Sequence, residues 1–281
     1  MMKDQMAIRL FSRQELVEEI AERQIAVLSN GGAGLMRPDK CSRFEPIRTL
    51  FDPSKIDEAV TWLSAPAGRF MYRKGRPANL TGVMWNRSNP ELWERSTRGK
   101  PIQRMSPKFP PPLFINYWTA DFDSKWAVSI GLQKIIDLAV GMFEESGSDF
   151  GILTTLADLN AKNIDRSETA ASISYQGLEP AHGLPGLYWI NLFSAPLASW
   201  LKLRTIPTNL AKMKSLGRSG VLLQFGTSPS ECRSNEVLEQ QQDVIAQLGP
   251  KRFFDIRSSS RKLEAPPWND LPHPIGRFRD K

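Results

Sequence analysis

The chain has 281 residues and a formal net charge of +7, with 41% hydrophobic and 24% charged residues. This composition is typical of a globular protein with a sizeable core, and it excludes a wholly disordered chain. Two cysteines, Cys41 and Cys232, cannot build a disulfide framework, so both are expected to be reduced thiols. The N-terminus has no apolar run of signal-peptide length, which predicts a cytoplasmic protein.

The first 108 residues predict two helices and one strand. Apolar residues at helical spacing predict an amphipathic helix over residues 12–32, with Ser12 as the start of a capping box and two glycines at the exit. A second helix is expected from Asp52, the N-cap, to about residue 63. One short strand is predicted over residues 82–85.

The chain after the proline cluster at 107–112 is more regular. A strand, a long helix and a strand are followed by a second strand and helix, and then by further elements. This order predicts an α+β fold, a mixed or mainly antiparallel sheet with helices packed on one face, and leaves open whether its two strand-helix-strand units are related. The expected elements are strands at 113–118, 150–155, 187–193, 219–226 and 252–256, and helices at 124–145, 196–203, 206–217 and 234–249.

A single domain is predicted over residues 1–257. Its N-terminal helical and basic portion covers 1–108, and its regular sheet-helix portion covers 109–257. The tail over 258–281 is rich in proline and cannot hold regular structure for long. We expect it to wrap the surface, with Trp268 and Phe278 as anchors.

The longest informative stretch, "GLPGLYWINLFSAPLASWL" at 183–201, contains no charged residue. It is long enough for a membrane helix, but two prolines and several polar residues disfavour insertion, so no membrane association is expected. It is interpreted as a central strand covered on both faces, followed by a short helix. Alternation places Tyr188, Ile190 and Leu192 on one face, and Asn191 on the other face is expected to tie down the following turn.

Charge is distributed unevenly along the chain. Residues 69–108 contain ten basic residues against two acidic ones, whereas residues 121–168 contain nine acidic residues against four basic ones. The basic segment, flanked by tryptophans, permits an alternative function as a nucleic-acid-binding protein. Trp118 and Trp126 are more simply core residues of a strand and a helix.

Residues for catalysis are scarce. The two histidines, His182 and His273, lie in apparent loops, and no HxH, HExxH or CxxC spacing indicates a metal site. The glycines at 31–34 follow a helix and lack the Lys-Ser/Thr of a phosphate-binding loop. We therefore expect no enzyme activity, no catalytic residue, no metal and no cofactor.

The stretch at 183–201, the later "GVLLQFGTSP" and the helix leading to "LGPKRFFD" together resemble bacterial immunity proteins of interbacterial toxin systems. The similarity is to immunity-protein family fifty-two and related type VI secretion immunity families, and it covers about residues 113–255. A Y-W-x-N strand near a proline or glycine turn carries it, although Ser194 and Ala195 stand here where such proteins often have a glycine. The matching residues are Pro185, Tyr188, Trp189, Asn191, Gly220 and Gly226.

The resemblance implies a non-enzymatic protein that binds and neutralises a cognate toxin, a nuclease of the restriction-endonuclease type. Because such nucleases tend to be basic around the substrate groove, the acidic stretch from Asp121 to Asp158 is the expected toxin-facing side. A solvated helix face is the alternative interpretation of that stretch. The candidate toxin-facing residues are Asp121, Asp123, Glu144, Glu145, Asp149 and Asp158.

The chain's net positive charge argues against phosphate mimicry by the whole surface. Either the acidic side meets the toxin locally, or inhibition proceeds by docking beside the active site or by blocking toxin assembly. The sequence sets neither the oligomeric state nor the interface.

Overall fold

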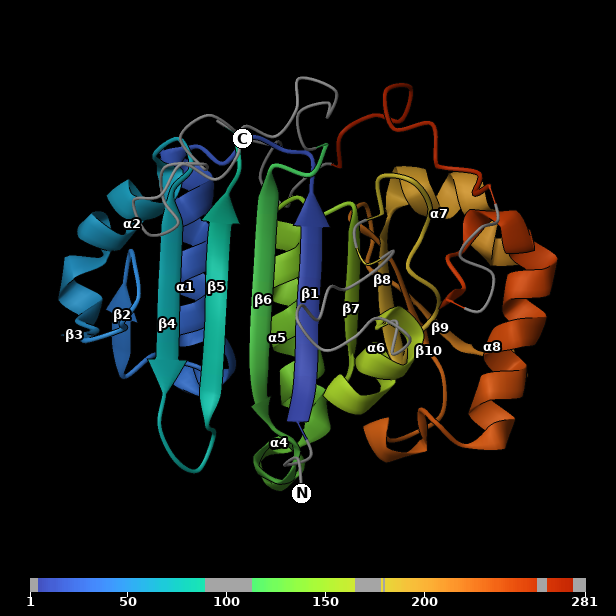
Figure 1. The fold of residues 1–281 in the computed structure, drawn as a ribbon, viewed down its shortest axis with the longest axis horizontal. Coiled ribbons are helices and arrows are strands. Elements are labelled where there is room, and N and C mark those ends of the chain that lie inside the picture. The colour runs from blue at the N-terminus through green and yellow to red at the C-terminus, as the bar shows by residue number, and fades with distance from the viewer. Residues whose placement is uncertain (1–4, 89–112, 165–177, 179, 257–261, 275–281) are drawn as a thin grey trace.

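The computed structural model describes residues 5–88, 113–164, 178, 180–256 and 262–274. Its strands form one sheet, in which every neighbouring pair is antiparallel and the order is β3-β2-β4-β5-β6-β1-β7-β8-β10-β9 (Figure 1). The strands are β1 Gln5–Ser12, β2 Lys40–Ser42, β3 Thr49–Leu50, β4 Arg69–Lys74, β5 Leu80–Asn86, β6 Asn116–Asp123, β7 Phe150–Thr155, β8 Ile190–Ser194, β9 Lys212–Ser215 and β10 Gly220–Gln224.

Helices lie on both faces of the sheet rather than on one. They are α1 Glu18–Gly34, α2 Ile56–Ser64, α4 Ser124–Ile130, α5 Leu132–Glu145, α6 Leu156–Asn163, α7 Ala195–Leu201 and α8 Asn235–Leu248. Short 3-10 turns cover Pro53–Lys55, Leu203–Thr205, Pro229–Glu231 and Pro250–Arg252. The α+β class and the antiparallel sheet predicted from the sequence are confirmed.

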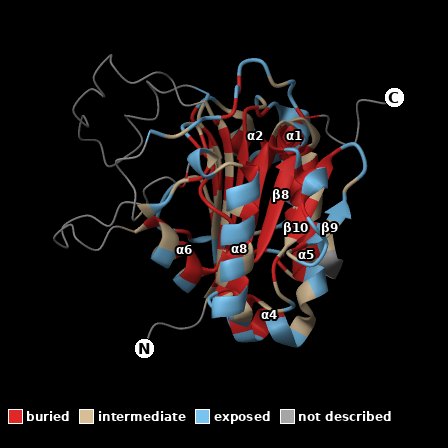
Figure 2. Ribbon diagram, turned by 90° about the vertical axis from the view of Figure 1, so that its right-hand side faces the viewer, coloured by how far each residue is buried: buried red, intermediate tan, exposed pale blue. Residues whose placement is uncertain are grey.

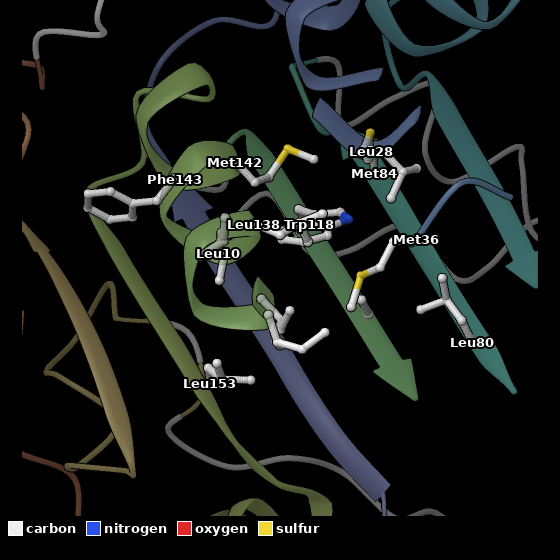
Figure 3. Packing of buried hydrophobic residues seen from close by; sticks show 14 of the residues in the cluster. Leu10, Leu28, Met36, Leu80, Met84, Trp118, Leu138, Met142, Phe143 and Leu153 are labelled. Carbon is white, nitrogen blue, oxygen red and sulfur yellow. The ribbon is translucent and has the colours of Figure 1, made fainter. Parts of the chain in front are cut away.

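The first helical layer, formed by α1, α2, α4 and α5, covers one face of the sheet. Alternate residues of the strands point into it, such as Ile8 of β1, Tyr72 of β4 and Trp118 of β6. Figure 3 shows side chains of this cluster, contributed by helices α1 and α5 and by the strands beneath them. The Trp118 indole donates a hydrogen bond of 2.6 Å to the Tyr72 hydroxyl, which satisfies a polar group inside the layer.

The second helical layer, formed by α6, α7 and α8, packs on the opposite face against β1, β7, β8 and β10, with Tyr117 of β6 and Met213 of β9 at its margins. Phe11, Phe150 and Phe193 point into it from neighbouring strands, with ring centroids of successive pairs 6.4 and 5.3 Å apart. Figure 2 shows α8 with an exposed outer side and β8 buried behind it. Strand β8 is therefore covered on both faces, as its composition predicts.

The strand β1 is the main element that the sequence pattern did not reveal. The alternation of apolar and polar residues that marks a strand is absent from β1, because both of its faces are buried and because Arg9, with 6% of its surface exposed, occupies the middle. Ser12 does not cap a helix: its hydroxyl donates to the Gly147 carbonyl at 2.9 Å and accepts from the Gln14 amide at 3.0 Å. Helix α1 begins six residues later than Ser12 for that reason.

Two other expected elements differ. The helix predicted at 124–145 breaks at Gly131 into α4 and α5, which are bent by 100°. The segment 206–217 contains the edge strand β9, because its residues pair with β10 across a tight hairpin closed by the Leu216 amide and the Gly220 carbonyl.

The end of the predicted domain also differs. Residues 252–256 are not a strand: Arg252 ends a 3-10 turn, and Phe253 makes one isolated parallel bridge with Leu184. Strand β4 is not among the elements predicted from the sequence, because the segment Arg69–Lys74 belongs to a basic run.

The two strand-helix-strand units differ in connectivity. Strands β6 and β7 are separated by β1, and their connecting helices lie in the first layer. Strands β8 and β10 are direct antiparallel neighbours, and α7 lies in the second layer. The sheet itself is continuous from the N-terminal portion to the regular portion, through the pairing of β5 with β6.

The described part of the tail packs on the second layer through Trp268, which is 5% exposed. Its ring meets Phe114 edge to face at 5.0 Å between centroids, and its indole donates to the Pro180 carbonyl at 3.1 Å. Trp268 is thus an anchor, as expected, while Phe278 lies outside the described residues.

Within the described residues, no single helix has the length and apolarity needed to cross a membrane. Only the bent pair of α4 and α5, taken together, reaches that length and composition.

Candidate interaction surface

The motif residues around Tyr188 are all buried and fix the conformation of the chain just before β8. The Tyr188 hydroxyl lies 2.5 Å from Asn163 Oδ1 and 2.7 Å from the Pro185 carbonyl oxygen. Trp189 lies in the first layer and Tyr188 in the second, the reverse of the predicted faces, because the regular strand begins only at Ile190. These residues build the core and are not accessible to a partner.

Asn191 has the structural role expected of a buried amide, but at a different place. Its Oδ1 accepts from the Tyr188 amide at 2.9 Å, and its Nδ2 donates to the Tyr188 carbonyl at 2.8 Å. The amide therefore fixes the chain before β8 rather than the turn at Ser194.

The two motif glycines are required by the backbone. Gly220 has φ of +149°, and a Cβ there would lie 1.9 Å from the Phe193 carbonyl oxygen across the strand pair. Gly226 has φ of +66° directly beyond β10, in the left-handed region that other residues rarely adopt. Both positions serve the close pairing and exit of β10.

Three of the six candidate acidic residues, Glu144, Asp149 and Asp158, are buried. Asp149 accepts from the Arg13 side chain at 2.8 and 3.1 Å and from the Arg13 amide at 2.9 Å. Burial raises the pKa of Asp149, and the hydrogen bonds and charge of Arg13 offset part of this rise. Arg13 also donates to carbonyls of the tail at Trp268, Leu271 and Pro272, so this pair joins the tail to β1.

Asp158 belongs to a second internal network. The Lys162 ammonium lies 2.9 Å from Asp158 Oδ1, and it donates to the Leu187 carbonyl at 2.7 Å and to Gln241 Oε1 at 2.9 Å. Burial, and then the charge of Asp158, raise the pKa of the nearby Cys232 thiol, which disfavours the reactive thiolate. The network ties α6 and α8 to the segment that precedes β8.

The remaining three acidic residues are partly exposed but engaged. Asp121 Oδ1 lies 2.8 Å from the Arg9 guanidinium, and Asp123 caps α4 by accepting from the Trp126 amide at 3.0 Å. Glu145 keeps 10% of its side chain exposed and lies 4.0 Å from Arg23.

The six candidates therefore do not form one exposed acidic face. Glu144, Asp149 and Asp158 are buried, so the prediction that they contact a toxin is wrong. Two groups of exposed acidic residues were not predicted from the sequence. One recurs at helical spacing on the outer side of α8, and the other lies at the start of α1. These residues are Glu236, Glu239 and Asp243, and Glu15, Glu18, Glu19 and Glu22.

A different surface stands out in the N-terminal half of the sheet. Helices of the first layer cover one side of β2, β4, β5 and β6, and no described helix covers the other side (Figure 1). We call the side of these strands that points away from the first layer the outer face. Its residues, which alternate with the core residues of the same strands, are Lys40, Ser42, Arg69, Met71, Arg73, Thr81, Val83, Trp85, Tyr117, Thr119 and Asp121.

The strand register arranges the outer face in rows across the sheet. Arg69, Trp85 and Tyr117 are consecutive cross-strand neighbours, and the row continues under the second layer with Phe11. Tyr117 and Phe11 have ring centroids 5.0 Å apart. The middle row contains Met71, Val83 and Thr119, and the third row contains Lys40, Arg73, Thr81 and Asp121.

Arginine and tryptophan form a stack at one end of this face. The Arg69 guanidinium carbon lies 4.1 Å from the Trp85 ring centroid, and that of Arg87 lies 5.8 Å from it. Burial lowers the pKa of Arg69, but an arginine stays protonated at neutral pH. The stack therefore presents positive charge on a rigid aromatic support.

Other candidate sites are weaker. A groove of about 500 Å³ lies between the β9–β10 end and the start of α8, but the Glu231 carboxylate that lines it already accepts from the Thr227 amide and hydroxyl at 2.8 and 2.9 Å. His182 and His273 are exposed in loops, and no group of metal-binding side chains occurs among the described residues.

The described chain is thus an antiparallel α+β protein in which one helical layer covers one face of the sheet and a second layer covers part of the opposite face, beside a cationic and aromatic row of side chains. A solved structure similar to it is that of the Pseudomonas aeruginosa T6SS protein PA0821, with 9% sequence identity and a TM-score of 0.47, over 97% of this chain and 90% of that chain. No family model matches the sequence. No curated protein matches it either.

Proposed function

We propose that this chain is an immunity protein that binds a cognate antibacterial toxin and neutralises it in a direct protein–protein complex. The toxin is proposed to be a restriction-endonuclease-like nuclease effector of type VI secretion, as the resemblance of the β8 and β10 motifs implies. The proposal includes no chemical step, no cofactor and no membrane contact, and it places both proteins in the cytoplasm.

The observation that carries the proposal is the row of Arg69, Trp85 and Tyr117 on the outer face. Arginine, tryptophan and tyrosine are the residue types that dominate binding energy at protein interfaces. On this face they stand on neighbouring strands, so little side-chain or backbone ordering is needed when a partner binds. Met71 and Val83 supply an apolar centre beside them.

The area of the outer face is smaller than the area that a stable protein complex buries. Four strands about 4.8 Å apart and about six residues long give roughly 300–400 Å². A stable complex buries about 800 Å² on each partner. Loops at the strand ends, beginning with the one that carries Arg87, therefore have to contribute to the contact.

A nucleic-acid-binding function through residues 69–108 is the alternative. Its described part places Arg69, Arg73 and Arg87 on or beside the outer face, which favours an anionic partner. Against it, the Trp85 ring is occupied by Arg69, whereas a base-stacking site needs a free aromatic face. Lys74 is also engaged, because it donates to the Arg37 carbonyl at 3.0 Å. Residues 89–108 lie outside the described part of the chain.

The test is co-expression with the product of the neighbouring gene, taken as the candidate toxin, followed by gel filtration, a growth assay and a nuclease assay. A co-eluting complex with suppressed nuclease activity and restored growth is the expected result. The test variant is Trp85→Ala. Its control is Trp200→Ala, which also removes an indole but lies on α7, away from the outer face. Asn191→Leu is not used because it would disturb the core.

Trp85→Ala is expected to lose protection while Trp200→Ala keeps it, with both proteins folded by circular dichroism. Separate elution of the wild-type proteins with undiminished toxicity would refute the immunity function. Tight binding of duplex DNA by the free chain, with a steep dependence on salt, would instead favour the alternative.

A further inference from the structure

We propose that the open edge of β9 accepts an extended acidic segment of another protein, which adds to the sheet as a further strand. The segment carries carboxylates at alternate positions, opposite Lys212 and Lys214. This inference goes beyond the proposed function, because β9 lies at the other end of the sheet from the outer face. It holds for any partner that offers such a segment.

Strand β9 is the last strand of the sheet on the side of the second layer. It pairs with β10, and no other described strand lies along its second edge. Figure 2 shows β9 exposed beside β10. Of its residues only Met213 is partly buried, and the others are exposed. An edge of this kind presents unpaired backbone donors and acceptors, which is the surface on which another chain adds a strand.

The hydrogen bonds of β10 show how its backbone groups are divided between its two neighbours. The Phe225 amide donates to the Trp189 carbonyl at 2.9 Å, in register with β8. The Leu216 amide donates to the Gly220 carbonyl at 2.8 Å, in register with β9. Because the backbone groups of a central antiparallel strand alternate between its neighbours, odd-numbered residues of β10 bond to β8 and even-numbered residues bond to β9.

This division decides which groups of β9 reach the open edge. Lys212 and Lys214 lie opposite even-numbered residues of β10, so their backbone groups bond to β10. The N–H and C=O groups of Met213 and Ser215 therefore point away from the sheet. An incoming strand finds two donors and two acceptors there, at the spacing of a regular antiparallel ladder.

The two lysines give the edge its charge. Both are exposed, and Lys214 forms no ion pair with a described residue. Lys212 lies near Glu231, whose pKa is lowered mainly by hydrogen bonds from Thr227 and to a smaller extent by the charge of Lys212. In an added strand, the residues opposite the lysines stand in non-hydrogen-bonded pairs, where side chains are closest. Carboxylates at those two positions meet the ammonium groups directly.

The same geometry disfavours a second copy of this chain as the occupant. When Met213 lies opposite Met213 or Ser215 of a second copy, Lys214 faces Lys212 or Lys214 of that copy. Like charges directly opposite one another destabilise a strand pair. Lysines on edge strands are also a common means of preventing self-association. The edge therefore disfavours pairing with itself and favours an acidic strand.

The groove next to Lys212 limits the length of the acidic part of the segment. The groove has a volume of about 500 Å³ and lies between the ends of β9 and β10 and the start of α8. Glu231 and Glu236 line it, so a chain of continuous negative charge is repelled there. A nucleic acid or a polyacidic tail is disfavoured for this reason. A strand with two carboxylates, followed by neutral or basic residues, fits the edge and the groove together.

The experiment measures binding of a short capped peptide to the full chain by NMR of the backbone amides. The peptide has glutamate at alternate positions with threonine or valine between them, and a peptide with lysine in place of glutamate is the control ligand. Lys214→Glu reverses the charge of the edge, and Lys134→Glu makes the same change at an exposed position of α5 as the matched control. Ser215→Pro removes an N–H that points to the open edge and leaves the bonds to β10 in place.

We expect the acidic peptide to shift the amide resonances of Met213 and Ser215 and to slow their exchange with solvent, because both N–H groups gain a hydrogen bond. A contact through side chains alone would not slow this exchange. Lys214→Glu and Ser215→Pro, both folded by circular dichroism, are each expected to weaken binding by about fivefold or more. Lys134→Glu is expected to remain within about twofold of the wild type.

Several outcomes would overturn the inference. Unchanged resonances and exchange at Met213 and Ser215, or equal binding of the acidic and the lysine peptide, show that the edge does not accept an acidic strand. If the free chain is a dimer that Ser215→Pro makes monomeric, the edge binds a second copy. If duplex DNA shifts the same amides and displaces the peptide, the edge is a nucleic-acid site. The experiment uses no toxin, so its failure leaves the proposed function standing.

Discussion

Replacement of Trp268 by alanine tests whether the described tail is part of the folded unit. The indole is 5% exposed, packs edge to face on Phe114 and donates to the Pro180 carbonyl. Burial of roughly 200 Å² of aromatic surface at about 25 cal/mol per Å² corresponds to about 5 kcal/mol as an upper value. With the lost hydrogen bond and partial relaxation of the cavity, we expect a loss of 3–5 kcal/mol.

The assay is urea unfolding followed by tryptophan fluorescence and circular dichroism, with Trp200→Ala as a control for the removal of an indole. Trp200 is only half-buried and stacks on Arg252 at 4.4 Å, so its loss is expected to cost about 1 kcal/mol or less. If Trp268→Ala unfolds at the same urea concentration as the wild type, the tail does not contribute to the core and the reasoning is refuted.

The remaining predictions concern the strand pair β8–β10 and the pH dependence that arises from buried tyrosine hydroxyls and a buried cysteine thiol. Gly220→Ala is expected to destabilise the protein by about 2–4 kcal/mol, because the added Cβ meets the Phe193 carbonyl. In Gly217→Ala the added Cβ meets no atom within 4 Å, so that variant is expected to cost about 1–2 kcal/mol from its positive φ alone. Equal urea midpoints for the two variants would contradict this. Burial raises the pKa of Tyr72 and Tyr188, and that of Cys41 to about 11, so the unfolded chain releases these protons at lower pH than the folded one. Stability is then fully present below about pH 8.5 and falls as pH rises through the unfolded values of about 8.5 for cysteine and 10 for tyrosine. Urea titrations at increasing pH measure this fall, which Tyr72→Phe is expected to reduce, and a flat profile would be evidence against it.

The elements predicted well are those whose burial is one-sided or whose ends carry local signals. Helix α8 is capped by Ser234, whose hydroxyl accepts from the Val237 amide, and this cap is recognisable in the sequence. Strands β7 and β10 have uninterrupted apolar runs that stand between clear turns. Local chemistry decided these elements, so sequence reasoning located them.

The elements that were missed are decided by distant partners. Strand β1 is a strand because β6 and β7 flank it, and the charge of Arg9 at its centre is balanced by Asp121, which lies beside it in the fold. Strand β9 likewise depends on its hairpin with β10, which overrides a helical pattern. Neither partner can be identified from a local window of sequence.

The candidate site was predicted only in its chemistry. The basic segment from residue 69 was recognised, but strand alternation, which separates Arg69 and Arg73 from Phe70 and Tyr72, was not. The predicted acidic face does not exist as one surface, because the charge of a residue in the sequence gives no information on its burial. Asp149 and Asp158 lie inside the protein, paired with Arg13 and Lys162. Charge along a chain and charge on a surface are different quantities.

The central position of β1 has a consequence for how the protein is made. The strand comes first in the chain, yet its two neighbours, β6 and β7, are synthesised more than a hundred residues later. Strand β1 therefore leaves the ribosome as a largely apolar segment before either of its neighbouring strands has been synthesised. Such long-range pairing predicts slow folding that is completed after synthesis, and a need for chaperones while β1 is exposed.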